Sequence, residues 1–251
     1  MKFKSSLKYQ LSGMTRSLII FYGVIYVLLI WMAVSHLIWN RSAVRWSTGG
    51  FESASIIFIF IAGLNAFKST FRMLLANGVS RVTMFKSYAV SVLPLAGTMA
   101  FIDSLNGLIF SSFTNYVPMY AQIYGGRYAG LPDNFGTAMQ IAGEGFLWMF
   151  FTYTMMAMAG FLITTLYYRM NKPLKLAVSI GVPVFLFVVL PYMSTVLFHG
   201  KLLSAIGAAI AAVWGLSNGP VPYIGMLTGT VSFALFGLFS FLAMRRAYIK
   251  E

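Results

Sequence analysis

The chain contains no cysteine, which excludes disulfides, thiolate metal sites and a cysteine nucleophile. Acidic residues are rare as well: there are five Asp and Glu in 251 residues, and only two histidines. Charged residues make up 9% of the chain, against about 25% in a soluble globular domain. Neither a GxxxxGK[ST] phosphate-binding loop nor an HExxH zinc motif occurs. We therefore expect no catalytic residues, no metal site and no ATP site in this chain, and we expect that it is not an enzyme.

Apolar residues, by contrast, make up 59% of the chain, and aromatic residues alone make up 17%. A soluble fold of this length has too little interior to hide that much apolar surface, so lipid must solvate much of it. A membrane-spanning helix needs about 20 mostly apolar residues. The runs of this kind are roughly 17–38, 51–71, 88–110, 141–167, 175–198 and 225–244. The first is longer than the apolar part of a cleaved signal peptide, so we interpret it as a permanent span. The prediction is an all-α integral membrane protein with one domain over 1–251.

Positive charge is distributed unevenly among the loops. A net charge of +13 would suggest nucleic-acid binding in a soluble protein, but here the cations fall between apolar runs and no nucleic-acid partner is expected. With six spans and a cytosolic N-terminus, 14 of the 18 Lys and Arg lie inside. The remaining cations are Arg41, Arg45, Arg127 and Lys201. This asymmetry predicts that both termini are cytosolic.

A seventh apolar run, 202–216, is too short to span. If it crossed, Arg245 and Arg246 would move outside, against the charge asymmetry. We therefore expect it to dip into the membrane and return, as a re-entrant helical element between the fifth and sixth spans, or to lie along the outer surface. Its small residues, such as Gly207 and Ala211, favour close packing against other helices.

The first 16 residues are basic, with Phe3, Leu7, Tyr9 and Leu11 interspersed. Such a pattern favours an amphipathic interfacial helix over 1–16 that lies on the inner leaflet and contacts anionic membrane lipids. A flexible tail is the alternative.

The segment 66–87 is a short basic elbow between the second and third apolar runs. Asn77-Gly78 predicts a helix stop, and Ser80 predicts the N-cap of the next helix. The elbow's cations stay out of hydrocarbon, while its apolar residues recur at helical spacing. The cations are Lys68, Arg72, Arg81 and Lys86, and the apolar stripe is Phe67, Phe71, Leu74 and Leu75. This elbow either presents a surface to a cytosolic partner or is an ordinary loop with snorkelling cations.

Three ionisable residues fall near the outer third of the spans: His36, Asp103 and Glu144. Intramembrane ionisable groups are functional candidates, although interfacial, wetted side chains that end their helices are the alternative here. Asp103 and Glu144 are the two acids that we expect to pair, and they would repel unless one is protonated or a cation such as Arg127 or Lys201 reaches them. Together with Asn65 and Asn106, these three residues are the polar path or gate candidates.

The loop 112–138 repeats tyrosine every four residues, at Tyr116, Tyr120, Tyr124 and Tyr128. On a helix these side chains share one face until Gly125-Gly126 interrupts it. The two interpretations are an aromatic belt at the lipid headgroups and a cap over an exit path. Prolines inside the spans predict kinks or local unwinding, at Pro94, Pro183 and Pro191.

These features together resemble the type-2 permease family of ATP-binding-cassette (ABC) exporters, the small six-span bacterial kind. The resemblance rests on the basic N-terminal segment, the elbow FRMLLANGVSR (Phe71 to Arg81), the apolar stretch between the fifth and sixth spans, and the cationic Arg245-Arg246 end. It covers the whole chain, by architecture more than by a strict motif.

The resemblance implies a permease subunit in the bacterial cytoplasmic membrane. In such an assembly two permease subunits, identical or related, pair with two ATPase subunits that bind ATP and Mg; this chain would hold no cofactor. The coupling helix would be Ser69–Gly78, with its docking surface and exit into the next span formed by Phe71, Arg72, Leu74, Leu75, Gly78 and Arg81. Parts of 54–67 and 179–195 would line the path. Compact members without an outer domain look like exporters of amphipathic peptides, including antimicrobial peptides and peptide toxins; a hydrophobic compound is the other expected cargo.

Two further functions stay open. A proton-coupled secondary carrier would use Asp103 and Glu144, although the sequence has no three-plus-three internal repeat of the kind found in many carriers. The other is a non-transporting membrane protein, such as an assembly factor or a small lipid-modifying enzyme.

Overall fold

The computed structural model describes residues 2–39, 48–132, 134–217 and 219–245. Apart from one pair of two-residue strands, the regular structure of this part is helical, and six helices are long and apolar enough to cross a membrane. This agrees with the predicted all-α membrane protein. The candidate spans are Phe3–Ser35, Glu52–Ala76, Arg81–Ser112, Phe135–Arg169, Lys172–Val196 and Pro222–Arg245.

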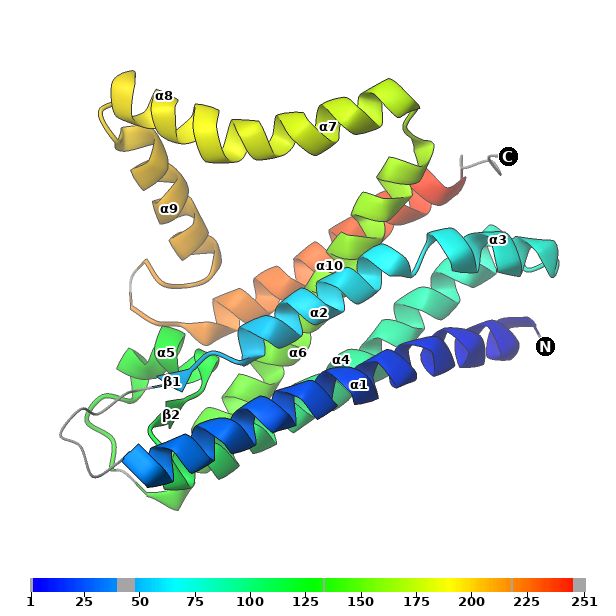
Figure 1. The fold of residues 1–251 in the computed structure, drawn as a ribbon. Coiled ribbons are helices and arrows are strands. Elements are labelled where there is room, and N and C mark those ends of the chain that lie inside the picture. The colour runs from blue at the N-terminus through cyan, green and yellow to red at the C-terminus, as the bar shows by residue number, and fades with distance from the viewer. Residues whose placement is uncertain (1, 40–47, 133, 218, 246–251) are drawn as a thin grey trace.

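The helices follow the predicted order, and most extend beyond the predicted limits (Figure 1). The long elements are α1 (Lys2–Trp39), α2 (Glu52–Asn65), α4 (Arg81–Phe113), α6 (Phe135–Arg169), α7 (Lys172–Val184) and α10 (Pro222–Arg245). The short ones are β1 (Thr48–Gly49), α3 (Lys68–Ala76), β2 (Tyr116–Val117), α5 (Met119–Tyr124), the 3₁₀ turn η1 (Gly125–Tyr128), the π-helical turn η2 (Phe185–Val189), α8 (Leu190–Val196) and α9 (Lys201–Val213). Strand β1 pairs with β2 in parallel.

Helix α6 lies at the centre of a bundle formed by α1, α2, α4, α6 and α10, and it packs against α2, α4 and α10. Two glycines permit the close crossing of α2 and α6. A Cβ atom on Gly63 would overlap the carbonyl oxygen of Ala157, and one on Gly160 would overlap that of Phe60. Small residues at such a crossing let the two backbones touch, which is the main source of van der Waals contact between helices in lipid.

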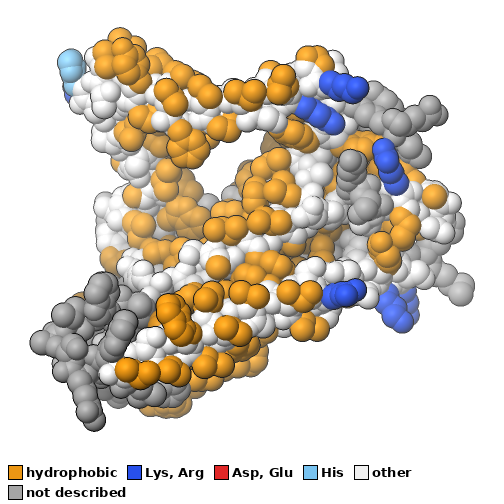
Figure 2. Space-filling view, viewed as in Figure 1, with side chains coloured by type: hydrophobic (Ala, Val, Ile, Leu, Met, Phe, Trp, Pro, Cys, Tyr) orange, Lys and Arg blue, Asp and Glu red, His pale blue; other side chains and the backbone are white. Residues whose placement is uncertain are grey.

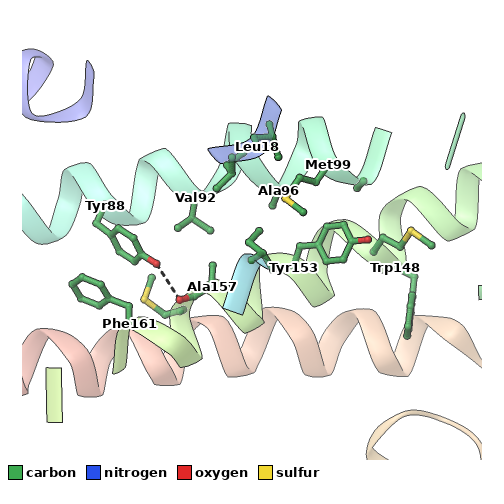
Figure 3. Close-up of a cluster of buried hydrophobic side chains, with 14 of the residues drawn as sticks. Leu18, Tyr88, Val92, Ala96, Met99, Trp148, Tyr153, Ala157 and Phe161 are labelled. Atoms are coloured by element: carbon green, nitrogen blue, oxygen red, sulfur yellow. Dashed lines mark hydrogen bonds between the residues drawn. The ribbon is translucent and has the colours of Figure 1, made fainter. Parts of the chain in front are cut away.

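The core of the bundle is aromatic and rich in methionine. Tyr88 of α4 stacks on Phe161 of α6, with ring centroids 4.1 Å apart, and donates a hydrogen bond to the carbonyl oxygen of Ala157 at 3.0 Å (Figure 3). Tyr88 therefore combines a packed ring with a satisfied hydroxyl, as buried tyrosines require.

The N-terminal segment differs from the expectation of a separate interfacial helix over 1–16. It forms the first turns of α1, which runs without a break from Lys2 to Trp39. Buried polar contacts hold it on α4: the hydroxyls of Ser6 and Ser87 lie 2.7 Å apart, and Gln10 donates to Ser87 at 2.8 Å. These contacts explain the difference, because they give the polar side chains a protein partner in place of the membrane surface.

The fifth span stands apart from the bundle. We call α7, η2 and α8 together the arm (Figure 1). None of the residues in its most apolar window is buried, and its extensive contacts in the described structure are with α9 alone. Figure 2 shows an opening between the arm and the bundle in this view. The π-helical turn of the arm lies between Pro183 and Pro191, where local unwinding was predicted, whereas α4 continues across Pro94.

The run 202–216 forms α9, a single 13-residue helix with no turn inside it. It joins the far end of the arm to the start of α10 (Figure 1).

Candidate functional site

Asp103 is the centre of a buried polar cluster where four helices of the bundle meet. Its side chain on α4 is 5% exposed. Tyr22 of α1 donates to its Oδ1 at 3.0 Å and Tyr153 of α6 donates to its Oδ2 at 2.5 Å, and Ser55 of α2 adds a third hydroxyl contact. Asp103 thus supplies two acceptor oxygens, and each of the three neighbouring helices supplies one hydroxyl group.

Glu52 is the residue that sequence reasoning missed. It opens α2 and is 2% exposed, and neither of its carboxylate oxygens has a hydrogen-bond partner in the described structure. Tyr116 and the backbone N–H of Met119 are close enough to interact with it electrostatically, but neither closes a hydrogen bond. Its position in the first turn of a span, next to a loop, gives no sign of burial in the sequence. Its burial comes from the loop that carries β2 and α5, which the sequence pattern does not place.

A cavity of about 160 Å³ lies beside these two acids. Glu52, Asp103 and Ser104 are among the residues that line it, and the Ser104 hydroxyl is also buried without a partner in the described structure. The rest of the wall is mostly apolar and comes from α4, α5 and α6. We call this space the acidic cavity.

The predicted pairing of Asp103 with Glu144 does not form. Asp103 shares the acidic cavity with Glu52 instead, and Glu144 is absent from its lining. Glu144 belongs to a second cluster, where Arg127 approaches it at 3.7 Å, as one of the predicted cations should. This is the one ion pair among the described residues.

The four repeated tyrosines form a cap on the N-terminal part of α6, not an aromatic belt. Their side chains are between 0% and 8% exposed, so protein surrounds them. Tyr120 and Tyr128 donate to Oε2 of Glu144 at 2.8 and 2.7 Å, and Tyr124 donates to the carbonyl oxygen of Trp214 at 2.7 Å. Only part of the repeat is α-helical, because Tyr116 lies in β2 and Tyr128 in η1. The tyrosine cap comprises Tyr116, Tyr120, Tyr124 and Tyr128.

Burial holds the hydroxyls of the cap in their protonated form. Burial raises the pKa of Tyr128 to about 12, and the Glu144 carboxylate adds to the rise. Burial and the nearby Glu52 carboxylate likewise raise the pKa of Tyr116. Tyr120 joins the two clusters, because it lines the acidic cavity and also bonds to Glu144.

The elbow matches the predicted secondary structure but not the whole predicted surface. Helix α3 stops before Asn77-Gly78, with Gly78 at φ +67°, and the Ser80 hydroxyl caps α4 by accepting from the N–H of Thr83 at 3.2 Å. Phe71 and Leu74, expected on the docking surface, are buried. Phe71 packs against Tyr168 of α6, with ring centroids 5.5 Å apart, so it anchors the elbow to the bundle. Arg72 is exposed and Leu75 is half-buried.

Asn65 and Asn106, two of the other predicted polar residues, are not among the residues that line the acidic cavity. Asn65 is exposed, donates to the carbonyl oxygen of Ile61 at 3.0 Å, and lines a larger cavity of about 460 Å³ beside α1 and α2. Asn106 is buried on α4, and Arg81 donates to the carbonyl oxygen of Arg245 at 2.7 Å. The side chain of His36 is outside the described residues.

The chain matches no family model, no curated protein and no solved structure. Its function therefore has to be argued from its own residues and geometry.

Proposed function

We propose that this chain is the membrane-spanning subunit of an ABC exporter, acting with a second permease subunit and with ATPase subunits that supply ATP and Mg. The observation that carries the proposal is the arm. A 25-residue apolar helix, Lys172–Val196, has no buried residue in its most apolar window. In lipid, helices associate through close packing, and this helix packs little against the rest of the described chain. A second permease subunit, identical or related, would supply the missing contacts.

The elbow supports a cytosolic partner. Many of the described Lys and Arg side chains gather at the end of the bundle where α3 lies (Figure 2). The positive-inside rule favours that end as cytosolic. The exposed Arg72 and Ala76 of α3 would then face the cytosol. Phe71 of α3 is buried and packs against Tyr168 of α6. A displacement of the elbow would therefore pass directly to the central helix of the bundle.

The cargo that we propose is an amphipathic peptide or a hydrophobic compound, exported across the bacterial cytoplasmic membrane. The opening between arm and bundle and the wide apolar surface of the arm are compatible with such a cargo.

The test is Arg72→Glu in the chain produced together with a candidate ATPase subunit, such as one encoded in the adjacent reading frame. We expect transport to fall by about tenfold or more, because reversal of a charge at an interface costs on the order of 1.4 kcal/mol or above. Lys86→Glu is the matched control, since Lys86 is an exposed cation at the start of α4. Normal co-purification and normal transport by the Arg72→Glu protein would count against the proposal. Labelling of an Ala76→Cys protein by a reagent added outside intact cells would also count against the proposal.

A cation-coupled carrier is the second candidate. The observation that favours it is the pair of buried acids, Glu52 and Asp103, with no Lys or Arg in ion-pair contact among the described residues. Transport that survives ATP depletion and stops when the proton gradient collapses would select this function over the first.

A further inference from the structure

We propose that the acidic cavity binds a primary ammonium group carried on a short apolar stem, with Glu52, Asp103 and Ser104 around the ammonium and the apolar wall around the stem. All of the residues of this site belong to this chain, so the proposal can be tested without any ATPase partner.

Among the described residues, no Lys or Arg forms an ion pair with the two acids of the cavity. Glu52 is 2% exposed and Asp103 is 5% exposed, and the one ion pair of the described structure, Arg127–Glu144, lies in the other cluster. A buried carboxylate without a partner is costly, because the hydration that it loses is not replaced by the protein. Neither oxygen of Glu52 accepts a hydrogen bond of normal geometry from the described residues, and an unsatisfied buried acceptor adds its own cost. A bound cationic donor removes both costs.

The open hydrogen-bond positions match an ammonium group. The Glu52 carboxylate and the Ser104 hydroxyl are buried, form no hydrogen bond with the described residues, and line the same cavity. Asp103 supplies a second carboxylate whose oxygens already accept from Tyr22 and Tyr153. An ammonium group has three N–H donors and no acceptor, so it complements three oxygen groups with no donor left over.

The remainder of the wall favours an organic cation over a metal ion. Leu108, Pro118, Ile141 and Met149 are among its apolar lining residues. Ca²⁺ takes six to eight oxygen ligands and Mg²⁺ demands a near-octahedral set, whereas Glu52 and Ser104 are the open oxygen groups here. The volume of about 160 Å³ exceeds that of a bare ion and admits an ammonium with a stem of a few carbon atoms. A lysine-like side chain or a small alkylamine has this chemistry.

The experiment measures binding of n-butylammonium chloride to the purified full-length chain in detergent or lipid nanodiscs, by calorimetry and by thermal unfolding. Neutral n-butanol and NaCl are the ligand controls. We expect n-butylammonium to bind and to raise the unfolding temperature, n-butanol to do neither, and NaCl to leave the unfolding temperature unchanged at the same ionic strength.

Glu52→Gln is the principal variant. We expect its affinity for n-butylammonium to fall by about tenfold or more, since it loses a charged hydrogen bond. Its unfolding temperature without ligand should not fall, because the change removes a buried unpaired charge; Glu52→Met, which is apolar, provides a second test of this. Ser104→Ala should weaken binding by about two- to tenfold. Ser240→Ala is its matched control, because Ser240 is also buried without a hydroxyl partner among the described residues and does not line the cavity.

Three results would overturn the proposal. Equal stabilisation by NaCl would assign the cavity to a metal ion, and equal stabilisation by n-butanol would make it a merely apolar cavity. Undiminished binding of n-butylammonium to Glu52→Gln would place the ligand elsewhere.

Discussion

The bundle and the arm are built from similarly apolar sequence, yet protein buries many residues of the bundle's central helix and none in the most apolar window of the arm. In the best window of α6, 56% of the residues are buried inside the protein, whereas in the arm the share is 0%. The mean hydropathy of the arm's window, 2.2, is in fact higher than the 1.7 of α6. Hydropathy thus predicts that a helix is in the membrane but not whether its neighbours are protein or lipid. What distinguishes α6 is its content of glycine and tyrosine at positions that touch other helices.

The largest contrast should come from adding bulk to a glycine in each region. Gly160→Leu should prevent folding, because even a Cβ at this position overlaps the backbone carbonyl oxygen of Phe60 in α2. Gly181→Leu in the arm is the control, since a Cβ there meets nothing within 4 Å. Fluorescence-detected size-exclusion chromatography of the two proteins measures the outcome. A folded, monodisperse Gly160→Leu protein would contradict the close crossing of α2 and α6.

A smaller contrast is expected for phenylalanine. Phe71→Ala removes a fully buried ring that packs on Phe67 and Tyr168, and we expect a loss of about 3–5 kcal/mol in the free energy of unfolding. Phe187 in the arm is 80% exposed, so Phe187→Ala should change the stability of the isolated chain little. Thermal unfolding in detergent compares the two. If Phe187→Ala destabilised the isolated chain as much as Phe71→Ala, the arm would have to pack on the bundle.

The smallest contrast concerns a single hydroxyl. Tyr153→Phe deprives the buried Asp103 of a donor at 2.5 Å, and we expect the free energy of unfolding to fall by about 1–3 kcal/mol. Tyr192→Phe in the arm serves as the matched variant, because Tyr192 is 65% exposed. The same unfolding measurement applies. An unchanged stability for Tyr153→Phe would show that Asp103 does not depend on this donor.

Local sequence signals predicted the elements well. The helix stop at Asn77-Gly78, the cap at Ser80 and the distortion between Pro183 and Pro191 depend on interactions within a few residues, and all three are present. The six apolar spans follow from length and hydropathy in the same way.

Predictions that depended on long-range neighbours were less successful. Ser6 and Gln10 looked like part of a surface helix because their partner, Ser87, is far along the chain. The tyrosine repeat looked like an aromatic belt because nothing nearby in sequence indicates that Glu144 and Trp214 would accept its hydroxyls. Phe71 and Leu74 looked available for docking because an apolar stripe has the same pattern whether it faces a partner or its own α6.

By itself, the sequence determined that lipid must solvate much of this protein and that it has six apolar helices. It also determined the helix stop and the N-cap within the elbow, and it excluded chemistry based on cysteine. These properties depend on composition and on short spacings, which any fold of the chain must respect. Only the tertiary structure decided that Glu52 and Asp103 share a cavity and that the fifth span stands apart from the bundle. Both depend on contacts between residues that are distant in sequence, and such contacts are set by how the helices pack.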